Sequence, residues 1–582
     1  MSDTQAASPH PDKDRDLASV QQARTLARRA RVAQAEIAEF SQEAIDAVVD
    51  GVARAVQPHA EALARLAVEE TGYGVVADKI RKNLFASQRV YEFIRPMRTV
   101  GVIRRLEEQR VVEIAEPFGV VAAIIPSTNP TSTAIYNFLI AVKARCVVVL
   151  SPHPAAERCI TRTAEIMRDA AVRAGAPADV LTWMTNVTLE GTQELMRARE
   201  VAVILATGGM GLVRAAYSAG KPAYGVGPGN APAYIERTAD VPRAVRDVVA
   251  GKTFDNGVLC SSENAVVVDE AVADQARAEF VKAGAHFLDP GQAEAVARIL
   301  VTPQRLPNPA LVGKSATYIA ERAGISVPPT TRVLVAPLGG VGRDEPLSIE
   351  KLCPVLAFYV VKDWREGCER CKQILRYGGM GHTMAIHSRD EEVILQFGLH
   401  KPAFRIVVNT PTTHGSTGMT TELAPALTLG CGGYGGNITS DNITPIHLLN
   451  IKRLAYGVRP AVSEPAGATS AAPDAAAGAP DGALTTRVEA FLAHRGFRDA
   501  SGSPVPDGTA TAAAPAGPTR ETTEPAVAPG SGRDPEPPPV DFVCEEDVRE
   551  AIRAGRKIRL AERAIVTPAA RDLGDAKFIF VA

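Results

Sequence analysis

The sequence predicts an α/β fold built on parallel sheets. Unbroken runs of Val, Ile and Ala, such as VVAAII at 120–125 and VVVL at 147–150, are typical of strands that are buried on both faces. The segment between them, STAIYNFLIAVKA, has the pattern of a helix, which completes a β-α-β unit. After residue 457 the composition changes abruptly to Ala, Pro, Gly, Ser and Thr, which predicts a tail outside the folded part.

Bulk properties of the chain favour small-molecule chemistry. Its 582 residues are too many for one compact domain, and a net charge of -2 gives no general reason to expect a nucleic-acid or membrane partner. The first residues lack the pattern of a signal peptide, and no run of about 18 apolar residues occurs, so we expect a cytoplasmic protein. Eight scattered cysteines fit a reducing compartment. Cys368 and Cys371 form a CxxC in a segment with a helical pattern, which favours a helical face over a metal or redox site.

Polar residues and glycines follow the ends of the predicted strands, where ligands of open α/β sheets bind. The first strand leads to Asn129 and the second to His153, while VAVILATGG runs into Gly208 and Gly209 ahead of a helix. Glycines at such a turn let a pyrophosphate approach free N–H groups and the positive end of the helix dipole. The chain has no convincing GxGxxG, and on residues alone Asn129 is as easily a turn residue beside a proline.

A single cysteine, Cys260, stands in GKTFDNGVLCSSEN between a glycine turn and small polar residues. A nucleophilic thiol needs N–H groups nearby to receive the charge that develops on an attacked carbonyl, and Gly257 and two serines leave such groups accessible. A buried structural cysteine fits the composition equally well, because free cysteine is among the most buried residue types. The residues alone leave both interpretations open.

The segment FDNGVLCSSE resembles the active-site signature of the CoA-acylating aldehyde dehydrogenases. These include the aldehyde dehydrogenase half of bifunctional aldehyde/alcohol dehydrogenases and enzymes of bacterial microcompartments. The similarity runs from about Ala23 to Gly457 through several motifs in order. It implies an aldehyde dehydrogenase-like fold with a Rossmann-variant cofactor domain and an α/β catalytic domain. It also implies that Cys260 is the nucleophile and that Asn129 helps to form the oxyanion hole.

The segment KPAYGVGPGNAPAYI carries the most mechanistic information. In hydrolytic aldehyde dehydrogenases the corresponding strand resembles a LELGGK pattern, whose glutamate activates the water that cleaves the thioester. Here that position falls at about Gly225, with Val226 next to it, and no carboxylate is present. Water attack on a thioester is slow without a positioned base, so coenzyme A, itself a thiol, would take the acyl group.

The resemblance also implies which residues hold NAD and move protons. SIEKLCPVLAFY resembles the family's EEIFGPV segment, so Glu350 matches the residue that holds the nicotinamide ribose. His382, in GGMGHT, is the candidate proton carrier, and His414, in TPTTHGSTG, is the alternative. No metal ligand is predicted. The predicted cofactor-binding residues are Pro126, Ser127, Thr128, Ser151, His153, Thr207, Gly208, Gly209, Gly225, Val226, Gly227, Glu350 and Leu352.

The predicted organisation has five parts. They are a flexible N-terminus at 1–20, an NAD-binding domain with a helical start at 21–230, a catalytic domain at 231–437, a return and oligomerisation segment at 438–457, and a disordered tail at 458–582. In relatives the last strand joins the sheet of a neighbouring subunit, so we expect a homo-oligomer. Short amphipathic helices near 485–496 and 545–555 interrupt the Pro/Ala-rich tail. They resemble encapsulation peptides, which direct cargo into microcompartments; the alternative is a helix that docks on its own catalytic domain.

The sequence therefore predicts an NAD-dependent, CoA-acylating aldehyde dehydrogenase. The expected substrate is a short aldehyde such as acetaldehyde or propionaldehyde, and the expected partners are coenzyme A and shell or cargo proteins of a microcompartment. Two alternatives stay open. One is the same chemistry on sulfoacetaldehyde, for which Arg405 is a candidate sulfonate ligand, and the other is a catalytically silent scaffold with the same fold.

Overall fold

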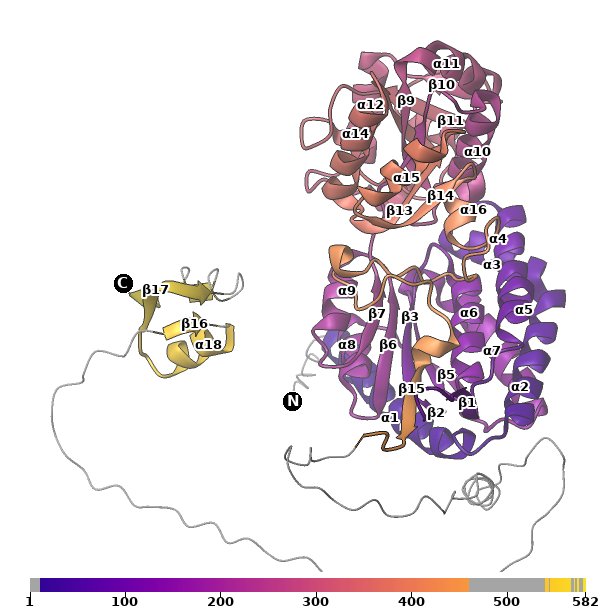
Figure 1. Ribbon diagram of the computed structural model, residues 1–582, viewed down its shortest axis with the longest axis vertical. Coiled ribbons are helices and arrows are strands. Elements are labelled where there is room, and N and C mark those ends of the chain that lie inside the picture. The colour runs from indigo at the N-terminus through magenta and orange to yellow at the C-terminus, as the bar shows by residue number, and fades with distance from the viewer. Residues whose placement is uncertain are drawn as a thin grey trace, which may run out of the picture. The chain divides into compact units, whose positions relative to one another are not determined.

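The structure, a computed structural model, describes residues 11–459 and, towards the C-terminus, residues 540–543, 545–566, 570, 573, 574 and 579–581. The chain divides into two compact units, residues 1–505 and 506–582 (Figure 1). The predicted helix near 485–496 lies outside the described residues. Within the described ranges, none of the helices combines the length and the apolar character needed to cross a membrane.

Helices open the first unit, in line with the helical start predicted for the segment 21–230. Apolar residues of α2 recur at three- and four-residue spacing, so Ile45, Val48, Val49 and Val52 fall on one buried face. A π-helical turn, Phe85–Arg89, joins the last two helices. The helix bounds are α1 Pro11–Ile37, α2 Gln42–Val56, α3 Ala60–Thr71, α4 Val76–Leu84 and α5 Val90–Ile94.

Residues 11–20 differ from the predicted flexible N-terminus, because they form the first turns of α1. This helix contacts α8, Leu189–Arg197. The Ser19 hydroxyl donates to the carbonyl of Asn186 at 2.5 Å. Such tertiary contacts stabilise a helix whose polar start gives little signal in the sequence.

A parallel sheet of five strands follows, in the order β5-β4-β3-β6-β7. All six residues of β3 are buried, which explains its unbroken apolar sequence. The predicted β-α-β unit is confirmed, since β3, α6 and β4 follow one another and the two strands pair in parallel. The strand bounds are β3 Val120–Ile125, β4 Val148–Pro152, β5 Leu181–Trp183, β6 Val201–Thr207 and β7 Ala223–Val226. The further helices are α6 Pro130–Lys143, α7 Glu157–Arg173 and α9 Met210–Tyr217.

A second parallel sheet has seven strands in the order β10-β11-β12-β9-β8-β13-β14. Five apolar runs in the sequence predict strands here, and they are confirmed as β9 and β11 to β14: NAVVVDEAV, RVLVAPL, VLAFYVV, TMAIHS and FRIVVNTP. The strand bounds are β8 Ala231–Ile235, β9 Glu263–Asp269, β10 Ala285–Phe287, β11 Val333–Pro337, β12 Val355–Val361, β13 Gly381–His387 and β14 Ala403–Val408. The helices are α10 Val241–Thr253, α11 Ala273–Lys282, α12 Pro290–Leu300, α13 Ala316–Arg322, α14 Trp364–Gly378, α15 Glu391–Leu399 and α16 Thr412–Ser416.

The CxxC pair lies on α14, where Cys368 and Cys371 are both buried, in line with the predicted helical face. Figure 1 shows the two parallel sheets in different lobes of the first unit, with the chain after β14 running back from one lobe to the other. The predicted boundary between residues 230 and 231 stays a prediction.

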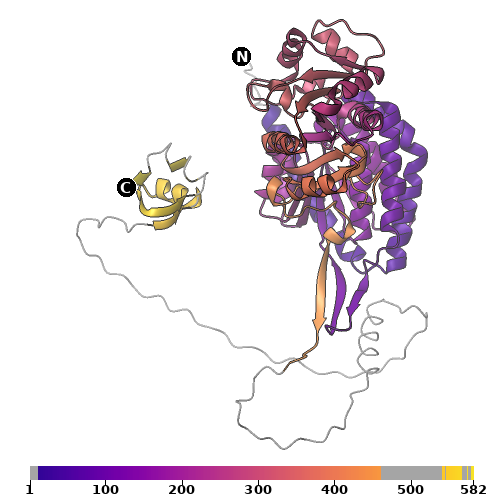
Figure 2. The ribbon, with the colours of Figure 1, turned by 45° about the horizontal axis from the view of Figure 1, so that its top comes forward.

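A three-stranded antiparallel sheet, in the order β1-β2-β15, extends from the body of the first unit as an arm (Figure 2). Its strands are β1 Gly101–Leu106, β2 Val111–Pro117 and β15 Leu449–Ala455. The strand predicted to end the folded region thus pairs with β2 of its own chain. Its pairing with a neighbouring subunit stays a prediction.

The second unit contains more regular structure than the predicted tail. The helix expected near 545–555 is confirmed as α18, Glu545–Arg553, and Gly555 follows it with φ +62. Three strands that were not predicted accompany it: β16 Val540–Val543, β17 Ile558–Val566 and β18 Phe580–Val581, paired in parallel. The apolar face of α18 packs on these strands, because Val548 and Ala551 share one buried cluster with Val543 and Ile579.

Candidate active site

A cavity of about 510 Å³ lies at the carboxyl ends of β3, β4, β6 and β7. The strand order of this sheet reverses between β3 and β6, and ligands of parallel sheets bind at such switch points. Every residue predicted as catalytic or cofactor-binding lines the cavity except His382 and Gly225, and the alternative candidates His414 and Arg405 do not line it. The predicted residues that line it are Pro126, Ser127, Thr128, Asn129, Ser151, His153, Thr207, Gly208, Gly209, Val226, Gly227, Cys260, Glu350 and Leu352.

The turn before Cys260 has an unusual backbone. Asp255, Asn256 and Gly257 lie in succession at φ +49, +53 and +71, a region that non-glycine residues rarely adopt. The N–H of Asp255 donates to Asp78 Oδ2 at 2.8 Å, and Asn256 Nδ2 donates to the carbonyl of Gly313 at 2.9 Å. A strained turn persists only where surrounding contacts hold it. The contacts of Asp255 and Asn256 therefore hold the turn that places Cys260 at the cavity.

The Cys260 thiol is protonated in the ligand-free protein at neutral pH. The side chain is partly exposed, whereas the other six cysteines of the described residues are buried. Burial, together with the nearby Glu350 and Cys431, raises the pKa of Cys260 to about 12, although Arg405 acts in the opposite direction. The thiol must therefore lose its proton when it attacks a substrate.

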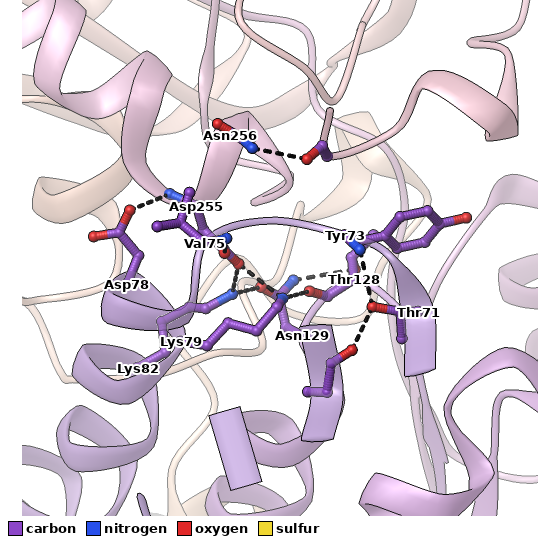
Figure 3. A network of polar contacts seen from close by, with 12 residues as sticks. Thr71, Tyr73, Val75, Asp78, Lys79, Lys82, Thr128, Asn129, Asp255 and Asn256 are labelled. Atoms are coloured by element: carbon purple, nitrogen blue, oxygen red, sulfur yellow. Dashed lines mark hydrogen bonds and ion pairs between the residues drawn. The ribbon is translucent and has the colours of Figure 1, made fainter. Parts of the chain in front are cut away.

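Asn129 is held from one side by a lysine (Figure 3). The residue is the N-cap of α6 and lines the cavity. Lys82 Nζ donates to Asn129 Oδ1 at 2.5 Å, while Asn129 Nδ2 donates to Thr128 Oγ1 at 3.1 Å. An amide nitrogen carries two hydrogens, so one N–H remains for a ligand in the cavity.

Glu350 is a buried carboxyl group on the same cavity. It accepts the N–H of Gly229 at 2.8 Å. Burial raises its pKa to about 7, although the Gly229 hydrogen bond and the charges of Lys252 and Lys351 act in the opposite direction. Glu350 can thus exchange a proton near neutral pH in addition to accepting hydrogen bonds.

The two candidate histidines do not reach this cavity. His382 is fully buried, with Nδ1 3.0 Å from Thr383 Oγ1 and Nε2 without a hydrogen-bond partner among the described residues. Burial lowers its pKa to about 3, so it is neutral at physiological pH. His414 stacks edge-on against Phe254 and lines a separate cavity of about 430 Å³. The role of His382 as a proton carrier stays a prediction.

Similarity to known proteins identifies the family of this chain. Residues 10–297 match the model of the aldehyde dehydrogenase family. The crystal structure of an acetylating aldehyde dehydrogenase from Geobacillus thermoglucosidasius is 50% identical in sequence, with a TM-score of 0.76. The match covers 77% of this chain and 99% of that one. The chain belongs to the aldehyde dehydrogenase family.

Two further relatives of this aldehyde dehydrogenase bear on its chemistry. The bifunctional aldehyde-alcohol dehydrogenase AdhE of Escherichia coli is 41% identical over 444 residues, which are 75% of this chain and 50% of that protein. The chain thus spans about half the length of the curated relatives that it matches first. A structure of Rhodopseudomonas palustris propionaldehyde dehydrogenase with bound CoA and an acylated cysteine is 26% identical and has a TM-score of 0.66. The match covers 75% of this chain and 97% of that one.

The cavity of this aldehyde dehydrogenase fits a nicotinamide dinucleotide. Thr207 Oγ1 is buried and has no partner within the described part of the chain. Gly209 caps the N-terminus of α9 without a side-chain hydrogen bond, so the first N–H groups of that helix are free for a phosphate. A Cβ at Gly209 or Gly211 would meet no atom within 4 Å, although both line the cavity. Backbone and ligand can therefore approach closely at this turn.

Gly225 differs from its predicted place beside the cofactor. Its N–H donates to the Tyr217 hydroxyl at 3.1 Å, and a Cβ there would lie 2.9 Å from Val213 Cγ1 on α9. Successive residues of a strand point to opposite faces, so the neighbouring Val226 lines the cavity. In this aldehyde dehydrogenase the position from which a carboxylate would face the cavity is 226, one residue beyond the predicted one.

Sequence reasoning missed the buried charges beside Asn129. Lys79 and Lys82 of α4 are buried and both contact the carboxylate of Asp255. VADKIRKNL has the pattern of an ordinary amphipathic surface helix, in which lysines face water. Lys79 and Lys82 are three residues apart, so they lie on one face of α4 together with the buried Asn83. This spacing was the signal in the sequence that could have pointed to a shared buried partner.

Proposed function

We propose that this aldehyde dehydrogenase oxidises a short, uncharged aldehyde with NAD and coenzyme A to an acyl-CoA. One observation carries the proposal: Cys260, Asn129 and Val226 line the same cavity. The first supplies a nucleophile and the second an N–H donor. The third presents an apolar side chain to the cavity, next to Gly225, the position that matches the glutamate of the hydrolytic enzymes.

In the proposed reaction the Cys260 sulfur bonds to the aldehyde carbon. Asn129 Nδ2 donates to the carbonyl oxygen as negative charge develops there. A bound nicotinamide would supply the acceptor for the hydride of this adduct, and its loss would leave an acyl-thioester on Cys260. Glu350 lies on the same cavity and has a pKa near 7, so it can take up the proton that the Cys260 thiol loses when it attacks.

Release of the acyl group is proposed to need a second thiol. Val226 offers no base to activate water, so hydrolysis of the thioester is slow. The coenzyme A sulfur instead bonds to the acyl carbon, and the Cys260 sulfur leaves and is protonated again. The CoA and the acylated cysteine in the Rhodopseudomonas palustris structure support this route.

The lining of the cavity favours an uncharged substrate over sulfoacetaldehyde. No Lys or Arg occurs among the described residues that line it. Arg405, the candidate sulfonate ligand, donates to the carbonyls of Ser440 and Gly430 instead. Acetaldehyde and propionaldehyde therefore suit the cavity better than a sulfonate does.

A panel of aldehydes assayed with and without coenzyme A tests this function. We expect NADH to form from acetaldehyde or propionaldehyde with CoA present, and the steady-state rate to fall at least about 100-fold when CoA is omitted. Sulfoacetaldehyde should react more slowly than either. Equal formation of free acid without CoA would refute the acylating mechanism, and no turnover of any aldehyde would favour a silent scaffold.

We further propose that the second unit directs the enzyme into a bacterial microcompartment. This unit has its own buried cluster, and a Pro/Ala-rich sequence joins it to the first unit. Deletion of residues 463–582 is expected to leave specific activity within about twofold but to abolish co-purification with co-expressed shell proteins. A large loss of activity would show instead that these residues serve the catalytic unit.

A further inference from the structure

Two buried lysines and one aspartate meet beside Asn129 (Figure 3). The side chains of Lys79 and Lys82 are 2% and 1% exposed, and that of Asp255 is 0% exposed. Lys79 Nζ lies 3.0 Å from Asp255 Oδ2, and Lys82 Nζ contacts the same oxygen. Burial of a charge is costly unless it is paired, so a second ammonium on one carboxylate calls for a further role.

The two ammonium groups differ in what else they contact. Lys79 Nζ donates to the main-chain carbonyl of Thr128 at 3.1 Å. Lys82 Nζ donates to the side-chain Oδ1 of Asn129 at 2.5 Å. Lys82 is therefore the one member of this pair that contacts the amide itself.

An ammonium group donates hydrogen bonds and accepts none, so it distinguishes the two ends of an amide. With Oδ1 held by Lys82, Nδ2 must point the other way, where it meets Thr128 Oγ1 at 3.1 Å. A cation at the amide oxygen also polarises the group and strengthens its N–H as a donor. Asp255 supplies one negative charge for the two ammonium groups, and its Oδ1 accepts from the N–H of Val75 at 2.7 Å.

We propose that Lys82 is a positioning residue, which fixes the Asn129 amide with its N–H toward the oxygen of an aldehyde bound to Cys260. The inference rests on the proposed function, since it assigns a support to the oxyanion donor of that reaction. Lys82 acts through Asn129 and does not itself line the cavity. Removal of Lys82 leaves Asp255 paired with Lys79, so the charge balance of the site survives the test.

A double-mutant cycle between Lys82→Met and Asn129→Ala tests this proposal. We expect Asn129→Ala to lower kcat about 100-fold and Lys82→Met to lower it about 10- to 100-fold, with the KM for aldehyde changed less than about threefold. In the double variant, Lys82→Met should add less than about twofold, because its partner is already gone. Alkylation of Cys260 by iodoacetamide, which needs no oxyanion donor, should proceed at the wild-type rate in Lys82→Met.

Lys79→Met is the matched control, because it removes an equally buried ammonium from the same carboxylate without touching the amide. Its effect should add fully to that of Asn129→Ala. Lys82→Arg keeps a cation within reach and should recover part of the activity lost in Lys82→Met.

Three outcomes overturn the proposal. They are additive effects of Lys82→Met and Asn129→Ala, a parallel loss of Cys260 alkylation, and failure of both Lys82 variants to fold, which would make the lysine a support of the fold. Absence of acyl-CoA formation by the wild-type enzyme in the same assays is a different result. It refutes the proposed function first, so the two failures are distinguishable.

Discussion

Cys260→Ala is expected to lower the rate of NADH formation from aldehyde and CoA by about 10⁴-fold or more. The substitution removes the sulfur that bonds to the aldehyde carbon, and no other cysteine among the described residues lines the cavity. The amide of Asn129 and the groups that suit the cofactor remain, so cofactor binding should be nearly unchanged. The rate is measured by absorbance of NADH, and binding by fluorescence titration.

Cys159→Ala is the control for this variant. Cys159 is buried on α7, and its thiol donates to the carbonyl of Ala156, away from the cavity. Its loss should cost stability but not the chemical step. Wild-type turnover by Cys260→Ala would refute the assigned nucleophile and the mechanism with it.

Val226→Glu is expected to convert the enzyme toward hydrolysis. A carboxylate at position 226 would face the cavity and activate water toward the acyl-thioester. We expect formation of free acid without CoA to rise about 100-fold, while acyl-CoA formation falls. Burial raises the pKa of such a carboxyl group, so the gain should grow with pH until the group is ionised. Acid and acyl-CoA are quantified by chromatography across pH 6 to about 9.

Gly225→Glu tests which of the two positions, 225 or 226, faces the acyl group. A side chain at 225 would collide with Val213 and Tyr217 of α9, so this variant should lose stability and gain no hydrolysis. A gain at 225 with none at 226 would show that the strand presents its other face to the acyl group. Thermal unfolding of both variants gives the stability comparison.

Periodicity was sufficient to predict the parallel strands, because buried strands such as β3 need long apolar runs that few other elements share. The spaced motifs were likewise sufficient to place Cys260, Asn129 and the glycines before α9 on one cavity. These features depend on local composition and chain order. Both are visible in a single sequence.

Features that depend on distant contacts were not predictable in the same way. Lys79 and Lys82 look solvated in the sequence, because their partner Asp255 lies more than 170 residues away. Whether a side chain of β7 faces the cavity or packs against α9 depends on its position along the strand. A shift of one residue, from 226 to 225, changes one into the other. The strands around α18 were missed because a Pro/Ala-rich sequence precedes them and two of the three, β16 and β18, are short.

The contact between α4 and the Cys260 turn has a consequence for how the enzyme matures. Asp255 meets Lys79 across 176 residues of chain, so the turn cannot be held before a helix made much earlier in synthesis has docked against it. The thiol therefore acquires its proper setting only after these two distant segments have met. A nascent or partly folded chain would contain Cys260 but would lack the contact that holds the turn before it.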